Sequence, residues 1–367
     1  MTVLEKVFLA VLQMTSGIGN AKIRDLLDYF GSAKAAWQAS ESEIIESKCL
    51  SLSVCEQLFD HRKQCMEVDA FAQKWDRQGI KLCSCFEEEY PRCLKEIFNP
   101  PMILYYCGDF SCCDKNIAIV GARKASAYGK SAAELLARDL AKAGAAVISG
   151  AARGIDTAAH QGALAAAGKT IAVLGCGVDI AYPPENRKLL AQIVEQGGAI
   201  VSEFAPGMAP LAKNFPARNR IISGLSDGVV VVEAAVKSGS LITAEFALAE
   251  GRDVFAVPGS IFSPMSSGCH DLIKQGAKLV EGAKDILAEY TMQYSSNKKN
   301  MVSLSDEEET VYQVLREDKP LTIEEIILKT RSDVSNVAFV VLQLELRGLI
   351  KEYAPHCYVR AVEEGVL

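Results

Sequence analysis

The strongest constraint on the fold is a regular alternation of short apolar runs with helical segments between residues 117 and 257. The runs predict strands over 117–120, 146–149, 170–174, 199–202, 228–233 and 253–257. The segments between them predict helices over 128–143, 155–167, 184–196, 218–225 and 240–251. Such alternation is typical of a doubly wound parallel sheet with helices on both faces. We therefore predict an α/β fold for this part of the chain.

The segment before the sheet predicts short helices over about the first 85 residues. Apolar side chains recur there at helical spacing, at Leu9, Leu12, Ile23, Leu26, Leu27 and Phe30. The turn Gly17-Ile18-Gly19 resembles a helix-hairpin-helix motif, whose glycines let backbone amides approach a phosphate. Residues 14–34 carry only three cations and two anions. A packing or protein-contact role is favoured for this segment, and DNA contact stays open.

The segment after the sheet predicts a polar linker and a winged-helix module. Residues 291–304 are polar, and the helices expected over 306–316, 322–330 and 334–347 precede a ribbon over 349–360. The third helix is the usual reader of a DNA groove, but here it offers one cation, Arg347. Residues 304–367 hold 7 basic and 13 acidic side chains. We predict protein contact for this module, and the domains 1–85, 86–290 and 305–367 with a linker over 291–304.

Composition excludes several classes of protein. Hydrophobic residues make up 49% and charged residues 23% of the 367, as in ordinary globular chains. No apolar run approaches the ~18 residues of a membrane span, and the N-terminus lacks the basic start of an export signal. The twelve cysteines form no C-x-x-C pair, so we expect reduced thiols in the cytoplasm. A zinc site among the cysteines of 83–113 is less favoured because their spacings suit tetrahedral chelation poorly.

Charge leaves room for an anionic ligand in the middle of the chain. The net charge is −7, yet residues 113–290 hold 18 basic and 17 acidic side chains. Ligands of parallel sheets lie beyond the carboxyl ends of the strands. The first loop there is Gly121-Ala122-Arg123, where a glycine turn, a helix N-terminus and an arginine suit a phosphate. Lys124 stands where a P-loop needs glycine, and no G-x-G-x-x-G follows the strand, so an ATPase is rejected and ordinary dinucleotide binding is disfavoured.

The second loop runs from Gly150 through Arg153 to Gly154 and predicts another anion nest at a helix entry. Asp156 is expected in the first turn of that helix. His160 follows one turn later and could serve as a general base. A hydrogen-bonded structural histidine is the favoured interpretation.

The third loop carries the strongest signal for nucleic acid. Lys213, Arg218 and Arg220 place three cations in eight residues, and Phe215 stands among them. Cations that hold phosphates beside an aromatic ring that stacks a base suit single-stranded nucleic acid. A chance solvated basic face is the alternative.

The fourth loop, at 237–240, predicts a further phosphate cradle from Lys237 and the backbone of Ser238, Gly239 and Ser240. Glu233 at the preceding strand end could be catalytic, but anchoring of a loop is favoured. Four such loops satisfy several phosphates in a row better than one small ligand.

The residues of these loops and of their surroundings resemble the DprA/Smf family of bacterial DNA-processing proteins. The resemblance covers about residues 86–290 and rests on Tyr90-Pro91, Leu94, Pro100-Pro101, Leu104-Tyr105, Gly121-Ala122-Arg123, Ser149-Gly150, Arg153-Gly154-Ile155-Asp156, His160, Tyr182-Pro183, Ser202-Glu203, Phe215-Pro216, Arg218-Asn219-Arg220-Ile221-Ile222 and Lys237-Ser238-Gly239-Ser240. The flanking modules match the family's common architecture, a helical domain of the SAM or helix-hairpin-helix type and a winged helix.

The resemblance implies an extended Rossmann-like core that binds single-stranded DNA without sequence preference, forms a homodimer, protects incoming DNA in natural transformation and loads RecA. It implies no catalysis, cofactor, metal or membrane. The predicted DNA-binding residues are Gly121, Ala122, Arg123, Gly150, Arg153, Gly154, Lys213, Phe215, Arg218, Asn219, Arg220, Lys237, Ser238, Gly239 and Ser240. The chain departs from the family pattern at Ala122, where serine is common, and at His270, where asparagine is usual.

Two other classes of function stay as alternatives. The core layout is also similar to the lysine-decarboxylase-like nucleotide phosphoribohydrolases. Those enzymes carry a Pro-Gly-Gly-x-Gly-Thr loop followed by glutamate, whereas residues 233–240 lack both the paired glycines and that carboxylate spacing. A structural adaptor without a DNA role is the third class, and the basic loop 213–220 disfavours it.

Overall fold

The computed structural model describes residues 1–65, 67–111, 113–290, 292, 304–316 and 319–361. The chain divides into two compact units, Met1–Gln293 and Tyr294–Leu367, and each is described here by itself. Within the described ranges, no helix has the length and apolarity needed to cross a membrane.

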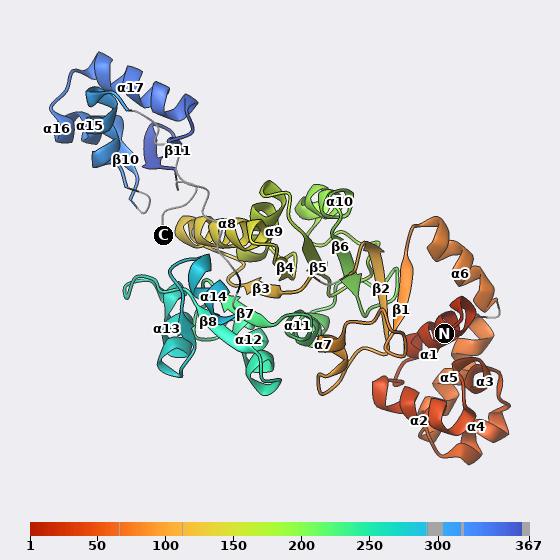
Figure 1. Ribbon diagram of the computed structural model, residues 1–367. Helices are drawn as coiled ribbons and strands as arrows, with labels where there is room; N and C mark the ends of the chain where they lie inside the picture. The colour runs from red at the N-terminus through yellow and green to blue at the C-terminus, as the bar shows by residue number, and fades with distance from the viewer. Residues whose placement is uncertain (66, 112, 291, 293–303, 317–318, 362–367) are drawn as a thin grey trace. The chain divides into compact units, whose positions relative to one another are not determined.

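The first unit is built around one nine-stranded sheet (Figure 1). Its strands are β1 (Lys81–Ser84), β2 (Ile103–Gly108), β3 (Asn116–Val120), β4 (Ala146–Ser149), β5 (Thr170–Val173), β6 (Ala199–Ser202), β7 (Gly228–Val231), β8 (Asp253–Ala256) and β9 (Lys278–Leu279), in the order β1-β2-β6-β5-β4-β3-β7-β8-β9. The six strands from β3 to β8 pair in parallel with one another. This arrangement confirms the predicted α/β fold with a doubly wound sheet.

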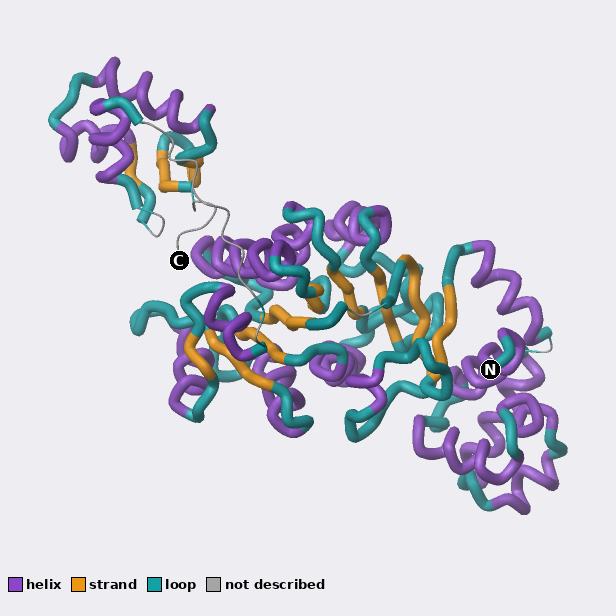
Figure 2. Tube along the Cα trace, in the orientation of Figure 1, coloured by secondary structure: helices purple, strands orange, loops and turns teal. Residues whose placement is uncertain are grey.

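Helices cover both faces of the sheet. Helices α8 (Ala127–Lys142), α9 (Ile155–Ala165) and α10 (Arg187–Glu195) lie on one face, and α11 (Asn214–Gly224) and α12 (Gly239–Ala249) lie on the other (Figures 1 and 2). The remaining elements after β1 are α7 (Arg92–Lys95), η1 (Pro184–Asn186), η2 (Pro264–Ser266), α13 (Ser267–Lys274) and α14 (Ala283–Glu289). Because both faces are covered, the strands β3–β7 are buried at every residue, which explains their continuous apolar runs.

The edge formed by β1 and β2 differs from the sequence reading. Strand β1 lies in the stretch predicted to be helical, and it pairs antiparallel with β2, with Leu82 opposite Tyr105. Strand β2 in turn pairs antiparallel with β6, where Tyr105 lies opposite Ser202. These pairings join residues far apart in the chain, so no local sequence pattern predicts them. They attach the N-terminal segment directly to the sheet.

Helix α11 begins four residues earlier than the 218–225 prediction, at Asn214. Pro216 falls in its first turn, where a proline is tolerated because the amide that it lacks has no partner within the helix. Phe215 therefore lies on a helix and not in a loop. This difference decides which side chains of α11 point in the same direction.

The N-terminal segment consists of six helices, as predicted apart from β1. They are α1 (Val3–Met14), α2 (Asn20–Phe30), α3 (Ala33–Gln38), α4 (Glu41–Ser47), α5 (Leu52–Gln64) and α6 (Val68–Arg77). Leu9, Leu12, Ile23 and Leu26 are fully buried, which confirms the helical spacing of these apolar residues. The turn between α1 and α2 holds Gly17 at φ +79°, in the left-handed region that favours glycine.

The second unit is a winged-helix module, as predicted. Its elements are α15 (Asp306–Val314), β10 (Leu321–Thr322), α16 (Ile323–Thr330), α17 (Val334–Leu346), β11 (Ile350–Ala354) and β12 (Cys357–Arg360). The three strands form a small antiparallel sheet in the order β10-β12-β11. Val311, Leu315, Ile326, Val337 and Leu344 belong to its apolar core. Most of the predicted linker lies outside the described residues.

The cysteines that the structure describes are free thiols. Across the described ranges, no three His, Cys, Asp or Glu side chains gather as metal ligands would. Cys112, part of the cluster considered for zinc, lies outside those ranges.

Candidate nucleic-acid interface

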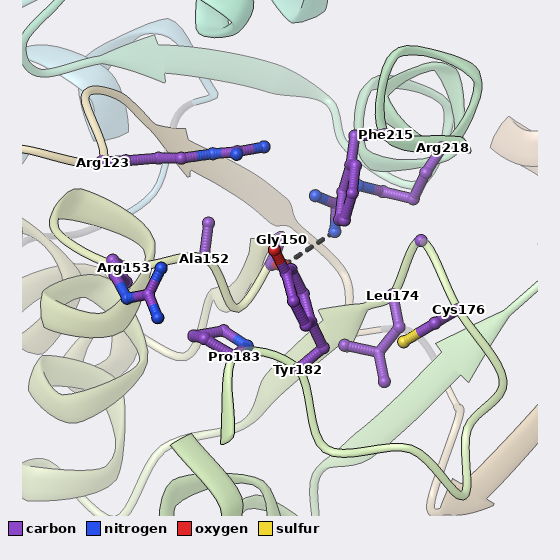
Figure 3. Close-up of a pocket in the computed structure, with 11 residues that line it drawn as sticks. Arg123, Gly150, Ala152, Arg153, Leu174, Cys176, Tyr182, Pro183, Phe215 and Arg218 are labelled. Carbon is purple, nitrogen blue, oxygen red and sulfur yellow. Dashed lines mark hydrogen bonds between the residues drawn. The ribbon is translucent and has the colours of Figure 1, made fainter. Parts of the chain in front are cut away.

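A groove of about 650 Å³ lies at the carboxyl edge of the parallel strands. The chain steps outward from β3 to β4, β5 and β6, and then returns to place β7 on the other side of β3. Loops that follow β3, β4 and β7, and the start of α11, line the groove at this reversal of strand order. A smaller pocket adjoins it, lined by Gly150, Arg153, Tyr182, Phe215 and others (Figure 3). Parallel sheets bind their ligands at such a position.

A cation and two aromatic rings form one stack at the junction of the groove and the pocket. The guanidinium of Arg123 lies over the ring of Phe215, 5.1 Å from its centroid (Figure 3). The ring of Phe215 lies 5.5 Å from that of Tyr182, tilted by 37°. Gly175 leaves room for this arrangement, since a Cβ there would come within 2.9 Å of the Phe215 ring. A planar base has stacking partners here, and its phosphate has a cation beside it.

Glu233 holds the loop that carries Arg123. Its side chain is 3% exposed and accepts hydrogen bonds from the Ser126 amide at 2.8 Å and the Ser126 hydroxyl at 2.5 Å. Its carbonyl accepts from the Ala122 amide at 2.8 Å. These bonds confirm the anchoring interpretation of Glu233. They also engage the amide of Ala122, whereas the side chains of Arg123 and Lys124 in the same loop are exposed.

Arg218 lies beneath the groove and points inward. Its side chain is buried, and Nη1 donates to the carbonyls of Gly150, at 2.7 Å, and of Val173 (Figure 3). Burial lowers the pKa of Arg218 to about 10. The sequence reading of Arg218 as an open phosphate ligand therefore does not describe this structure, where its guanidinium supports the floor of the site.

A buried carboxylate of the protein lies at the predicted anion nest after β4. Asp156 is buried, and its carboxylate accepts a hydrogen bond from the Ala152 amide at 3.3 Å. Burial raises the pKa of Asp156, while the nearby charge of Arg218 acts in the opposite direction. Asp156 and Arg218 are thus two buried groups of opposite charge under the groove, and each acts on the pKa of the other.

His160 is a structural histidine, as favoured from the sequence. It is fully buried, and its Nδ1 lies 2.7 Å from the hydroxyl of Thr170, which itself donates to the Val147 carbonyl at 2.7 Å. Burial lowers the pKa of His160 to about 3, and the charge of Arg218 adds to the effect. The imidazole is therefore neutral near pH 7, and Thr170 fixes its orientation.

Arg220, predicted to bind DNA, does not line the groove and is engaged by a carboxylate instead. Its guanidinium pairs with Glu203 on another side of α11, at 2.6 Å, and both side chains are 11% exposed. Lys213 is exposed at the start of α11, beside Ala212, which lines the groove. Arg153 lines the adjoining pocket and pairs with Glu185.

The start of α12 forms the far wall of the groove. The Ser238 hydroxyl caps the helix by accepting from the Ser240 amide at 3.4 Å, and Lys237 beside it is exposed. The side-chain Nδ2 of Asn219 donates to the Gly239 carbonyl at 3.2 Å and ties α11 to this wall. A helix N-terminus with an exposed lysine beside it suits an anion.

The structure brings most of the predicted residues together. The groove and its pocket are lined by Gly121, Ala122, Arg123, Gly150, Arg153, Phe215, Arg218, Asn219, Lys237, Ser238, Gly239 and Ser240. Gly154, Lys213 and Arg220 do not line it. Sequence reasoning missed Tyr182 and Lys124 as groove residues, and the aromatic at the end of the loop after β5 was the available signal for Tyr182.

Gly154→Ala is expected to damage both stability and the groove. Gly154 has φ +80°, and a Cβ there would lie 2.3 Å from the Ala122 carbonyl oxygen. We expect the free energy of unfolding to fall by more than the roughly 1–2 kcal/mol that left-handed backbone costs alanine, and the Arg123 loop to shift. Gly144→Ala is the matched control, because Gly144 has φ +88° with nothing within 4 Å of the added Cβ. Gly154→Ala should lower both the stability measured by chemical denaturation and the affinity of the groove for its ligand, whereas the control should lose stability alone. Equal behaviour of the two variants would contradict the close contact between Gly154 and the Ala122 carbonyl.

The fold and the groove define a Rossmann-like protein with a groove lined by basic and aromatic side chains at the carboxyl edge of its sheet. The sequence profile of DNA recombination-mediator protein A matches residues 81–291, and that of the DprA winged-helix domain matches residues 298–354. The DNA processing protein DprA of Streptococcus pneumoniae is 40% identical over 276 residues, which cover 75% of this chain and 95% of that protein. Protein Smf of Escherichia coli is 41% identical over 282 residues, 74% of this chain and 75% of its own length. The chain belongs to the DprA/Smf family of DNA-processing proteins.

Solved structures of the family agree with the fold. The X-ray structure of DprA from S. pneumoniae matches with a TM-score of 0.63 and 39% identity, over 80% of this chain and 99% of that one. A structure of DNA processing protein A from Helicobacter pylori matches with a TM-score of 0.52 and 32% identity, over 58% of this chain and 95% of that one. The latter is described by its single-stranded DNA binding mode.

Proposed function

We propose that this chain binds single-stranded DNA without sequence preference in the groove at the carboxyl edge of its sheet. The observation that carries the proposal is the stack of Arg123, Phe215 and Tyr182, flanked by the exposed cations Lys124 and Lys237. Stacking on an aromatic ring tolerates every base, and cations follow the phosphates. The single-stranded DNA binding mode of the H. pylori relative supports the same ligand.

The proposal extends to a mediator role without catalysis. As the family resemblance implies, the protein protects incoming DNA in the cytoplasm, acts as a homodimer and delivers the strand to RecA. The groove supports a binding role, because its candidate acid–base groups serve the structure. Glu233 anchors a loop, and His160 has a pKa of about 3. Asp156 is buried and accepts a hydrogen bond from a backbone amide. The nucleotide phosphoribohydrolase is less favoured for the same reason.

The test is fluorescence anisotropy of a labelled oligo-dT against a duplex of equal length, over a range of salt concentrations. We expect tighter binding of the single strand, with log Kobs falling by about 0.7 per log unit of salt for each phosphate neutralised. Equal affinity for both forms would contradict the groove assignment. If no binding appears at low salt, release of base from nucleoside monophosphates would test the hydrolase.

Phe215→Ala is expected to weaken oligo-dT binding roughly tenfold to hundredfold, because a stacked base is worth about 1–3 kcal/mol. The salt slope should stay unchanged, since no phosphate contact is lost. Phe215→Tyr is the matched control, because it keeps the ring and should bind much as the wild type does. A Phe215→Ala variant with wild-type affinity would exclude stacking at this position.

A further inference from the structure

On the side of helix α11 away from the groove, Glu203 and Arg220 form a largely buried ion pair that has no part in the proposed DNA contacts. Glu203 directly follows β6, and both of its carboxylate oxygens accept from Nη2 of Arg220, at 2.6 and 2.7 Å. Nη1 of Arg220 is buried and has no hydrogen-bond partner among the described residues. Removing the carboxylate would leave a buried guanidinium without the acceptor that satisfies Nη2.

The pair lies on a different side of α11 from the groove. Phe215, Asn219 and Ile222 line the groove, whereas Arg220 turns toward Glu203. One helical turn after Arg220, Gly224 packs closely on α7, since a Cβ there would lie 2.7 Å from Leu94. On this side, α11 is thus held by the Glu203–Arg220 ion pair and by the close packing of Gly224 on α7.

The N-terminal helices contact the same carboxylate. Asn20, the first residue of α2, donates through Nδ2 to Oε1 of Glu203 at 3.3 Å and to the carbonyl of Pro100 at 3.0 Å. Gln13 near the end of α1 donates to the backbone carbonyl of Glu203 at 3.1 Å. The turn around Gly17-Ile18-Gly19, for which the sequence leaves DNA contact open, therefore places Asn20 in contact with Glu203 and Pro100.

We propose that Glu203, Arg220 and Asn20 are positioning residues for single-stranded DNA binding. They set the rotation of α11 about its axis, and so hold the Phe215 ring against Tyr182 and under Arg123. The N-terminal hairpin acts on the groove through this contact. The inference rests on the proposed function, because it concerns how the same groove is held.

The competing interpretation makes Arg220 a phosphate ligand that Glu203 masks. The two interpretations predict opposite results for Glu203→Gln, which removes the charge and keeps the side-chain size. If Arg220 binds phosphate, Glu203→Gln frees it, so affinity rises and the salt slope steepens by about 0.7. If the pair positions α11, affinity falls roughly tenfold, as when a base loses part of its stacking platform, and the salt slope is unchanged.

The experiment measures oligo-dT anisotropy over a salt range for wild type, Glu203→Gln, Phe215→Ala and the double variant. We expect the double variant to bind no more weakly than Phe215→Ala alone, because the pair acts through Phe215. Glu203→Asp, which keeps the carboxylate, should recover most of the affinity. Asp227→Asn is the control, since it breaks the Lys115–Asp227 pair at the amino ends of β3 and β7, away from the groove, and should leave binding unchanged.

Several results would overturn the proposal. These are tighter or unchanged binding by Glu203→Gln, or additive losses in the double variant. If Glu203→Gln does not fold, Asn20→Ala serves in its place, with an expected loss of about threefold that is again absent in the Phe215→Ala background. Failure of the wild type to bind oligo-dT would overturn the proposed function and this inference together. If the wild type binds and neither Glu203→Gln nor Asn20→Ala changes the affinity, the inference alone is overturned.

Discussion

Arg123→Ala is expected to weaken oligo-dT binding at least about tenfold, because a hydrogen bond to a charged group contributes about 1.5–3 kcal/mol. The same change should flatten the salt slope by about 0.7, since one phosphate contact is lost. It also removes the cation that lies over Phe215 at 5.1 Å. All sequences should be affected alike, because a phosphate contact carries no base information.

The matched control for Arg123→Ala is Arg77→Ala, which removes an exposed arginine from the last turn of α6. This variant should bind as the wild type does, with the same salt slope. Equal losses in both variants would show that net charge, and not the groove, governs the affinity. An unchanged affinity in Arg123→Ala would contradict the assignment of the groove.

Arg218→Met is expected to lower the free energy of unfolding by about 3–5 kcal/mol, because it leaves an uncompensated buried charge. Arg218 is 4% exposed and supports the carbonyls of Gly150 and Val173, and its charge opposes the raised pKa of Asp156. Asp156 is the charge left without compensation. Urea denaturation with a folding-sensitive probe measures the change.

The pH dependence of the Arg218→Met variant provides its internal check. A carboxyl whose pKa is higher in the folded than in the unfolded state destabilises the protein as pH rises through that interval. Without Arg218, the pKa of Asp156 rises further, so the stability loss should be larger at pH 8 than at pH 5. Asp156→Asn in the Arg218→Met background should recover part of the loss. A loss that is independent of pH and of Asp156 would contradict the buried pair.

The sheet could be predicted from the sequence because its strands are buried on both faces. Continuous apolar runs such as 117–120 and 146–149 are too short for helices and favour strands, and the loops that follow them lie where parallel sheets bind ligands. Strand β1 could not be predicted, because a four-residue edge strand depends on pairing with residues about twenty positions away. The sequence favours structural roles for Glu233 and His160, and their hydrogen bonds supply the physical reason.

The basic loop shows where sequence reasoning fails. Arg218 and Arg220 are two positions apart, and on a helix such residues do not face the same side. The sequence prediction groups the three cations of 213–220 as one cluster, although both arginines fall within the helix predicted over 218–225. The structure separates them into an exposed lysine, a buried arginine under the groove and an arginine paired behind α11.

Photocrosslinking of an oligo-dT that carries 5-iodouracil tests the central claim most directly, with the attached peptides mapped after tryptic digestion. Cleavage after Lys213 and Arg218 isolates Asn214-Phe215-Pro216-Ala217-Arg218, so the stacking aromatic lies in a peptide of its own. We predict that this peptide and the one containing Tyr182 carry the crosslinked base, and that excess unlabelled oligo-dT prevents it. Crosslinks confined to the winged-helix module or to the hairpin around Gly17 would contradict the account.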